Sequence, residues 1–232
     1  GVLARLGRCL PLPWRLRLRR GILLRFPSLY ATERVQYEGS LTPDEVQALI
    51  ARLEASLGFA GDVIECGCFL CGTTVLMARL LKTRRLPKRI YACDTFAGFD
   101  PHEIRREQEV GDATRRHSFK ETDLQYVRRK LERLDVADQV VLVQGLFQET
   151  LGALDGPFCF AFIDCDLHDS MLYAARTVWP RLSPGGSCVF DDYENDEYRG
   201  ATRAVDAFIA ERSHDIREHG RLLRKLYYAV KA

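Results

Sequence analysis

The sequence contains no long uninterrupted apolar run, and no stretch reaches the roughly 18 consecutive apolar residues that a membrane-spanning helix needs. It also lacks a marked excess of charge, because 34 Lys and Arg residues face 32 Asp and Glu residues, for a formal net charge of +2. A balance this close to neutral does not favour nucleic acid as a partner. No internal repeat is visible, so the 232 residues predict one domain over residues 41–232 after a lead-in segment over residues 1–40.

Acidic residues are absent before Glu33, in a segment that is rich in arginine. The arginines there are Arg5, Arg8, Arg15, Arg17, Arg19, Arg20 and Arg25. They interrupt the apolar stretches, as do Pro11 and Pro13, and this pattern is unlike that of a secretory signal peptide. We therefore expect a helical or frayed lead-in and no membrane partner, with an anionic surface or partner as the alternative.

The eight cysteines are an even number, which in a small secreted protein would indicate a disulfide framework. Here, however, Cys93, Cys159, Cys165 and Cys188 lie in or beside apolar runs, where buried free thiols are common. A domain of this size can build a core without covalent cross-links. We therefore expect reduced thiols and a cytoplasmic location.

Signals for helices and strands alternate along most of the chain. Thr42 is a candidate N-cap, Pro43 occupies the first helical position and Glu45 completes a capping box, so a helix should begin here and end by Gly58. Buried strands are predicted at residues 62–66, 89–93, 139–143, 158–164 and 187–191. Helices are predicted at residues 73–82, 122–134, 170–182 and 201–212. Residues 215–219 and 226–231 should form a closing antiparallel pair around Gly220.

Strands that alternate with helices predict an α/β fold. We expect a seven-stranded, mostly parallel sheet with right-handed crossovers and a terminal antiparallel strand. Ligands of such sheets bind beyond the carboxyl ends of the strands. Residues that carry chemistry should therefore follow the strands directly.

Three loops after predicted strands carry residues that suit a nucleotide cofactor. Glu65 and Gly67 belong to the first loop, where small residues let the backbone turn sharply, although a full G-x-G-x-x-G is missing. Asp94 ends the next strand and could accept hydrogen bonds from ribose hydroxyls or cap a helix, with Thr95 beside it. Gln148 follows the third strand and could contact adenine or face solvent.

The first of these loops also contains Cys66, Cys68 and Cys71 in a C-x-C-x-x-C pattern. Three thiolates are too few for a closed structural zinc site, and the sequence offers no fourth ligand nearby. We interpret these cysteines as the small residues of a tight turn.

Carboxylates follow the fourth and fifth predicted strands. Asp164 ends the fourth strand within an I-D-x-D pattern, and Asp191 and Asp192 end the fifth. Unpaired, such a cluster would repel itself, and a hard divalent cation such as Mg²⁺ removes the repulsion. The alternative is that these acids cap the following helices or pair with arginines.

Together these stretches resemble the macrocin O-methyltransferase (TylF-like) family. The resemblance covers residues 61–208 and rests on GDVIECGCFLCGTT, RIYACDTFAGFD, VVLVQGLFQETL, FIDCDLHDSMLYAARTVWPRLSPGGSCVFDDY and RGATRAVDAF. It implies a Rossmann-like class I methyltransferase fold, S-adenosylmethionine as cofactor and Mg²⁺. By position it implies that Glu65, Gly67 and Asp94 serve the cofactor and that Asp164, Asp191 and Asp192 bind the metal.

The resemblance implies methyl transfer to a hydroxyl of a small acceptor, and a sugar of a glycosylated natural product is the expected one. The cation would bind and acidify that hydroxyl. His168 is the candidate base, with Asp164 or Asp192 as alternatives, although His168 could simply begin a helix. The charged segment 101–119 is either a lid over the acceptor or a solvated loop, and a homodimer is possible.

Two other functions remain open. One is an NAD(P)-dependent or nucleotide-sugar oxidoreductase, against which the incomplete glycine pattern and the strand-end acids argue. The other is a non-catalytic module that binds S-adenosylmethionine, against which the Asp191–Asp192 pair argues.

Overall fold

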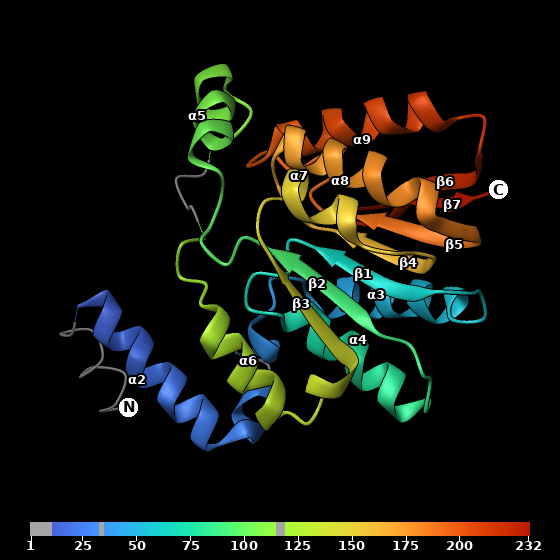
Figure 1. Cartoon of the computed structure of the whole chain (residues 1–232). Helices are drawn as coiled ribbons and strands as arrows, with labels where there is room; N and C mark the ends of the chain where they lie inside the picture. The colour runs from blue at the N-terminus through green and yellow to red at the C-terminus, as the bar shows by residue number, and fades with distance from the viewer. Residues whose placement is uncertain (1–10, 33–34, 115–118) are drawn as a thin grey trace.

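The computed structural model describes residues 11–32, 35–114 and 119–232. Its strands form one sheet in the order β3-β2-β1-β4-β5-β7-β6 (Figure 1). The strands are β1 (Asp62–Cys66), β2 (Ile90–Asp94), β3 (Val140–Gln144), β4 (Phe158–Ile163), β5 (Leu182–Phe190), β6 (Ile216–Leu223) and β7 (Leu226–Lys231). The first five are parallel, whereas β7 runs antiparallel to both β5 and β6. This arrangement confirms the predicted seven-stranded, mostly parallel sheet.

Helices cover both faces of the sheet (Figure 1). One layer holds α3 (Pro43–Ser56), α4 (Gly72–Thr83) and α6 (Leu124–Arg133). The other holds α7 (Phe147–Thr150), α8 (His168–Val178) and α9 (Arg199–Arg212). Each layer closes its own hydrophobic core against the sheet, as expected for a parallel sheet that is buried on both sides.

The central strand β4 shows why this sequence forms a two-sided core. All six of its residues are buried. Phe160 and Phe162 pack into the core under α3 and α4, whereas Ala161 and Ile163 pack into the core under α8 and α9. Successive side chains of a strand point to opposite faces, so a continuous apolar run suits this central position.

The lead-in segment contains the helix α2 (Leu12–Arg25), which packs beside α6. Its Leu23 side chain is buried, and the Arg20 guanidinium donates to the Asp123 carboxylate at 3.1 Å. Arg5 and Arg8 lie outside the described residues. Within the described ranges, no helix combines the length and the apolar character needed to cross a lipid bilayer.

Two segments differ in detail from the expectation. The segment 101–119, which we expected to be either a lid over the acceptor or a solvated loop, contains the helix α5 (Pro101–Val110), and its residues 115–118 lie outside the described part. Gly220 is not the turn of the closing hairpin, because β6 continues past it to Leu223. The chain reverses at Arg224, which adopts a left-handed backbone conformation with φ of 50°.

Candidate functional site

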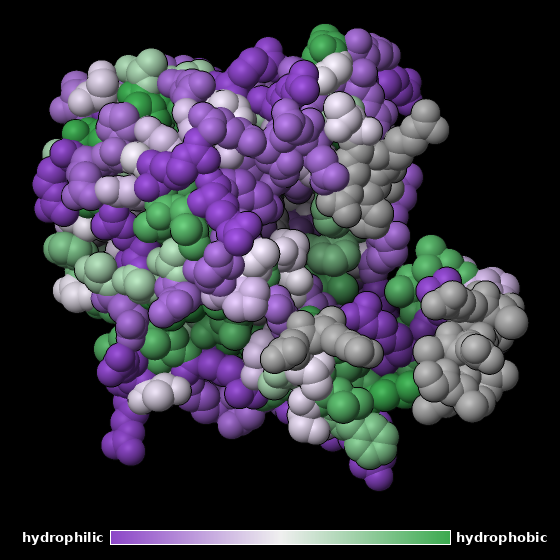
Figure 2. All heavy atoms as spheres, turned by 180° about the vertical axis from the view of Figure 1, so that it is seen from behind, coloured by the Kyte–Doolittle hydropathy of each residue, from purple (hydrophilic) through white to green (hydrophobic). Residues whose placement is uncertain are grey.

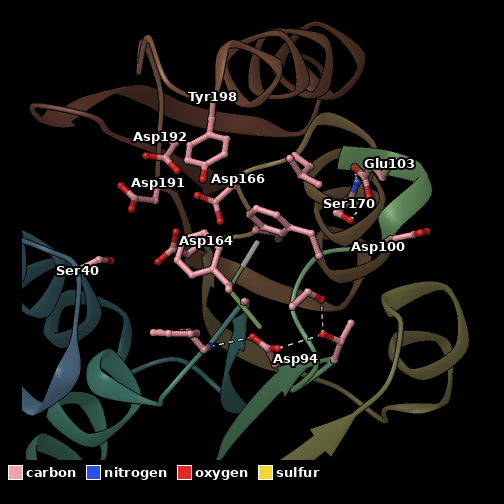
Figure 3. A pocket seen from close by; sticks show the side chains of 18 of the residues that line it. Ser40, Asp94, Asp100, Glu103, Asp164, Asp166, Ser170, Asp191, Asp192 and Tyr198 are labelled. Carbon is pink, nitrogen blue, oxygen red and sulfur yellow. Dashed lines mark hydrogen bonds between the residues drawn. The ribbon is translucent and has the colours of Figure 1, made fainter. Parts of the chain in front are cut away.

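A cavity of about 430 Å³ opens at the carboxyl ends of the parallel strands (Figure 3). Gly67, Asp94, Thr95 and Gln148 line one part of it, beyond β1, β2 and β3. Carboxylates that follow β4 and β5 line another part. The structure thus brings most of the predicted site residues to a single cavity.

The loop after β1 depends on a glycine. Gly67 has φ of +91°, and a Cβ atom added to it would lie 1.8 Å from the backbone oxygen of Asp164. Only a residue without a side chain lets the β1 and β4 ends approach this closely. The glycine therefore keeps the two loops together, and its own backbone lines the cavity.

We expect Gly67→Ala to destabilise the fold by at least about 3 kcal/mol, because it adds a backbone clash to a left-handed conformation. The measurement is the free energy of unfolding in urea, followed by circular dichroism. Gly152→Ala is the matched control, since no atom lies within 4 Å of a Cβ added there. Equal stability of the two variants would contradict the role given to Gly67.

Side chains from α6 and from the loop before it hold the loop after β1 by hydrogen bonds to its carbonyl groups. The Lys130 ammonium is buried, donates to the Leu70 carbonyl at 2.6 Å and pairs with the Glu38 carboxylate at 3.2 Å. The Thr122 hydroxyl donates to the Phe69 carbonyl at 3.0 Å. These supports could not be predicted from the sequence, because a lysine within a helix usually faces solvent.

Asp94 closes the loop from the cavity side (Figure 3). Its carboxylate accepts hydrogen bonds from the backbone N–H groups of Phe69 and Phe96, both at 2.8 Å. Burial raises the pKa of Asp94, and these two bonds oppose the increase. A carboxylate offers about four acceptor positions, so Asp94 can still accept hydrogen bonds from a ligand in the cavity. The neighbouring Thr95 hydroxyl donates to the Gly98 carbonyl at 2.6 Å.

Glu65, which we expected at the cofactor, is not among the residues that line the cavity. It lies beneath the β1 loop, is 1% exposed and accepts a hydrogen bond from the Thr74 hydroxyl of α4. Burial raises its pKa to about 8. Its position indicates a support for the loop rather than a direct contact with a ligand.

The raised pKa of Glu65 predicts a pH-dependent stability. The folded state holds this proton more tightly than the unfolded state, whose pKa is near 4.5, so stability should fall as the pH rises from about 4.5 through about 8. We expect Glu65→Gln to remove this contribution, which amounts to a few kcal/mol at about 1.4 kcal/mol per pKa unit. Urea unfolding at pH values across this window measures it. The exposed Glu132→Gln control should retain the wild-type dependence.

Three aspartates converge on the other part of the cavity (Figure 3). Asp164, Asp166 and Asp192 each present an oxygen, and these oxygens all lie within 4.8 Å of one another. Burial raises the pKa of both Asp164 and Asp166, and neighbouring carboxylates add to the increase. At Asp192 burial acts in the same direction, but Lys225 and the hydrogen bonds it accepts lower its pKa overall.

Lys225, from the β6–β7 turn, reaches this acidic group. Its ammonium nitrogen lies 2.8 Å from Asp191 Oδ2 and 2.9 Å from Asp192 Oδ1. The other oxygen of Asp191 is buried and has no hydrogen-bond partner among the described residues. Lys225 therefore pairs with both Asp191 and Asp192. Asp191 also lines the cavity, but the converging group contains Asp166 where we had expected Asp191.

The candidate base His168 does not line the cavity. It is the first residue of α8, and its ring Nδ1 lies 2.8 Å from Asp169 Oδ1. Its backbone N–H donates to the Glu107 carboxylate at 2.6 Å. The structure therefore places His168 at a helix start, which was the alternative to a catalytic role.

Aromatic side chains form an apolar wall in the part of the cavity near the helix α5, whose own Glu103 also lines the cavity. Phe99 makes edge-to-face contacts with Phe119 and Tyr198, at ring-centroid distances of 5.0 and 6.1 Å. Hydrogen bonds to α8 hold α5 in place. The Glu103 carboxylate accepts one from the Ser170 backbone N–H at 2.7 Å and another from the Ser170 hydroxyl. The helix α5 thus borders this part of the cavity and is held there by fixed contacts.

Comparisons with known proteins agree with this geometry. The sequence model of the macrocin-O-methyltransferase (TylF) family matches residues 39–219. One relative is the 8-demethyl-8-(2,3-dimethoxy-alpha-L-rhamnosyl)-tetracenomycin-C 4'-O-methyltransferase of Streptomyces olivaceus. It is 32% identical over 152 residues, which are 62% of this chain and 57% of that protein. The mycinamicin III 3''-O-methyltransferase of Micromonospora griseorubida is 29% identical over 151 residues, 59% of this chain and 56% of that protein. The chain thus spans less than two thirds of the length of these curated relatives.

Solved structures show the same fold. The O-methyltransferase NovP superimposes with a TM-score of 0.73 at 22% identity, covering 94% of this chain and 99% of that one. A calicheamicin methyltransferase superimposes with a TM-score of 0.70 at 19% identity, covering 98% of this chain and 89% of that one. With its sheet order, its strand-end cavity and a family match over most of its length, this chain belongs to the macrocin O-methyltransferase (TylF) family.

Proposed function

We propose that this chain transfers a methyl group from S-adenosylmethionine to a hydroxyl of a small acceptor. The observation that carries the proposal is the cavity itself, in which Gly67 and Asp94 stand opposite a group of three converging carboxylates. A nucleotide-binding loop beside an acidic group is what methyl transfer to an activated hydroxyl needs. Membership of the family supports the same reaction.

The cofactor would lie along the ends of β1, β2 and β3. Asp94 would accept hydrogen bonds from its ribose hydroxyls, and the backbone at Gly67 would let it approach the loop closely. Gln148 lines the cavity beyond β3 and would contact the adenine. The hydrogen bonds that fix Asp94 on Phe69 and Phe96 hold the carboxylate in place before any ligand arrives.

The acidic group of Asp164, Asp166 and Asp192 fits a divalent cation such as Mg²⁺. Its candidate metal ligands are all carboxylate oxygens, and these lie within 4.8 Å of one another. We assign Asp164 and Asp192, at the ends of adjacent strands, as the residues that would hold it. When bound, such an ion would lower the pKa of the acceptor hydroxyl and fix its oxygen. The Lys225 ammonium pairs with both Asp191 and Asp192, so it would offset part of the negative charge beside the ion.

Asp166 is the residue that we assign to accept the proton of the acceptor hydroxyl. It lies beyond the strand end, in a left-handed conformation with φ of 62°, and its side chain lines the cavity (Figure 3). Burial raises the pKa of this carboxyl, so it can hold a proton more readily than an exposed aspartate. The apolar wall at Phe99 and Phe119 would exclude water from the reacting atoms.

We propose a sugar of a glycosylated natural product as the acceptor and the cytoplasm as the place of reaction. The relatives from Streptomyces olivaceus and Micromonospora griseorubida bear the names of such O-methyltransferases. Carboxylates that accept hydroxyl hydrogen bonds, beside aromatic rings that pack on the apolar face of a sugar, suit a polyhydroxylated acceptor. The cavity offers both kinds of group.

Thermal melting with added ligands tests the proposal. S-adenosylmethionine and S-adenosylhomocysteine should each raise the melting temperature, since a ligand that binds the folded state alone stabilises it. Release of S-adenosylhomocysteine in the presence of Mg²⁺ and a panel of glycosides, free sugars and catechols then identifies the acceptor class. A shift with NAD and none with S-adenosylmethionine would contradict the proposal and favour an oxidoreductase.

A further inference from the structure

The helix α2 and the residues directly after it carry most of the large apolar side chains that the described part of the chain exposes. Trp14, Leu18, Ile22 and Phe26 follow one another at four-residue intervals, and each is between 42% and 60% exposed. Leu12 and Leu29 extend the same set at its two ends. Side chains four residues apart lie on one side of a helix, so Trp14, Leu18 and Ile22 form a continuous stripe, and Phe26 follows directly after the last helical residue. We call Trp14, Leu18, Ile22 and Phe26 the α2 stripe.

The α2 stripe does not face the protein core. The opposite side of the helix contacts the body through the buried Leu23 and through Arg20, whose guanidinium lies over the Tyr126 ring at 4.8 Å. A groove beside the α2 stripe is lined, within the described part of the chain, by residues between Trp14 and Phe26, among them Gly21. Figure 2 shows green hydrophobic side chains among purple ones on the lobe that projects at the lower right, where α2 lies.

The charges around the α2 stripe are all of one sign. Arg15, Arg17 and Arg25 form no ion pair with a described residue, in contrast to Arg19 and Arg20, which pair with Glu38 and Asp123. The guanidinium of Arg17 lies 5.7 Å from the Trp14 ring, and that of Arg25 lies 5.6 Å from the Phe26 ring. The first acid in the sequence is Glu33. Among the described residues, this face therefore offers apolar surface and positive charge without an ion-pair partner, and no negative charge.

We propose that α2 docks this protein on an anionic lipid surface, with the α2 stripe inserted among the acyl chains and Arg15, Arg17 and Arg25 at the headgroup phosphates. Arginines that border an apolar stripe, with a tryptophan among them, are the composition of helices that lie in a membrane interface. A second copy of the chain is a poorer occupant, because two such faces would bring their unpaired arginines together. This inference favours the anionic surface that the sequence analysis held as the alternative, and it does not depend on the proposed reaction.

Intrinsic fluorescence of the purified full chain provides the test. The sequence has two tryptophans, Trp14 and Trp179, and Trp179 is only 1% exposed. A vesicle-induced blue shift therefore reports Trp14. We expect the shift, together with co-sedimentation, for vesicles of equimolar phosphatidylcholine and phosphatidylglycerol, and neither effect for phosphatidylcholine alone. Raising the salt concentration should weaken binding.

Variants separate the apolar and the charged contributions. Leu18→Glu/Ile22→Glu should reduce binding at least about tenfold, because it introduces two charges into the inserted face. Each of Arg15→Gln, Arg17→Gln and Arg25→Gln should weaken binding about fivefold. Val110→Glu is the matched control, since Val110 is a 70% exposed apolar residue on α5, and it should bind as the wild type does.

Two results would overturn the proposal. One is the absence of a blue shift and of co-sedimentation with the anionic vesicles. The other is a dimer by light scattering that Leu18→Glu/Ile22→Glu converts to a monomer while the wild type leaves vesicles unbound, which would assign the α2 stripe to contacts between copies. Circular dichroism shows whether the variants remain folded, as replacements on an exposed face should.

Discussion

Asp166→Asn should lower kcat by a factor of about 10²–10⁴, which is the usual contribution of a positioned general base. The amide keeps the shape of the side chain but has no basic oxygen to accept the hydroxyl proton. Because Asp166 is not assigned to the cofactor, the affinity for S-adenosylmethionine should remain close to the wild-type value. Steady-state release of S-adenosylhomocysteine measures kcat, and calorimetric titration measures the cofactor affinity.

Two further variants decide between roles within the acidic group. Asp164→Asn should raise the concentration of Mg²⁺ needed for half-maximal activity, whereas Asp166→Asn should change that concentration little. His168→Gln tests the assignment that the sequence suggested. If His168→Gln loses as much kcat as Asp166→Asn and Asp166→Asn stays active, the proton passes to the histidine and the assignment made here is wrong.

The sheet was predictable because its parallel strands are short apolar runs in the sequence, and polar residues follow them directly. The run from Phe158 to Ile163 is apolar at every position, which in a chain of alternating helices and strands indicates a central parallel strand. The helix α5 was missed because Ile104 and Val110 are the only large apolar residues in it, so it shows no apolar periodicity. Its start was nevertheless marked, since Asp100 caps it by accepting from the His102 N–H at 2.8 Å.

The candidate site was predictable where a residue's place follows from the strand it ends. Asp94, Asp164 and Asp192 lie at the cavity for this reason. Asp166 belonged to the I-D-x-D pattern, but its direction depends on a left-handed backbone that sequence spacing does not show. The role of Lys225 could not be predicted from the sequence, because only the antiparallel pairing of β7 with β5 brings the β6–β7 turn to the strand ends. His168 was assigned by nearness in sequence, and the start of α8 places it outside the cavity lining.

Lys225→Met should destabilise the protein without added cation by about 3–5 kcal/mol, the usual effect of removing one partner from a buried ion pair. The Asp191 side chain is 1% exposed, and Lys225 is the partner of its Oδ2. With the lysine present, burial and then Asp192 still raise the pKa of Asp191 to about 6. Without it the pKa should rise further, so that the variant loses more stability than the wild type as the pH rises above about 6. Urea unfolding at several pH values measures both effects.

Arg224→Met is the matched control, because Arg224 is in the same turn but pairs with Asp44 at the surface. Such a pair contributes about 0–1 kcal/mol, so the control should stay near wild-type stability at every pH. Mg²⁺ should then stabilise Lys225→Met more than the wild type, because the ion no longer competes with an ammonium for Asp192. A smaller Mg²⁺ effect in the variant than in the wild type would instead show that the lysine prepares the carboxylates for the ion. The comparison therefore decides whether the chain's own cation and the divalent ion exclude or assist each other.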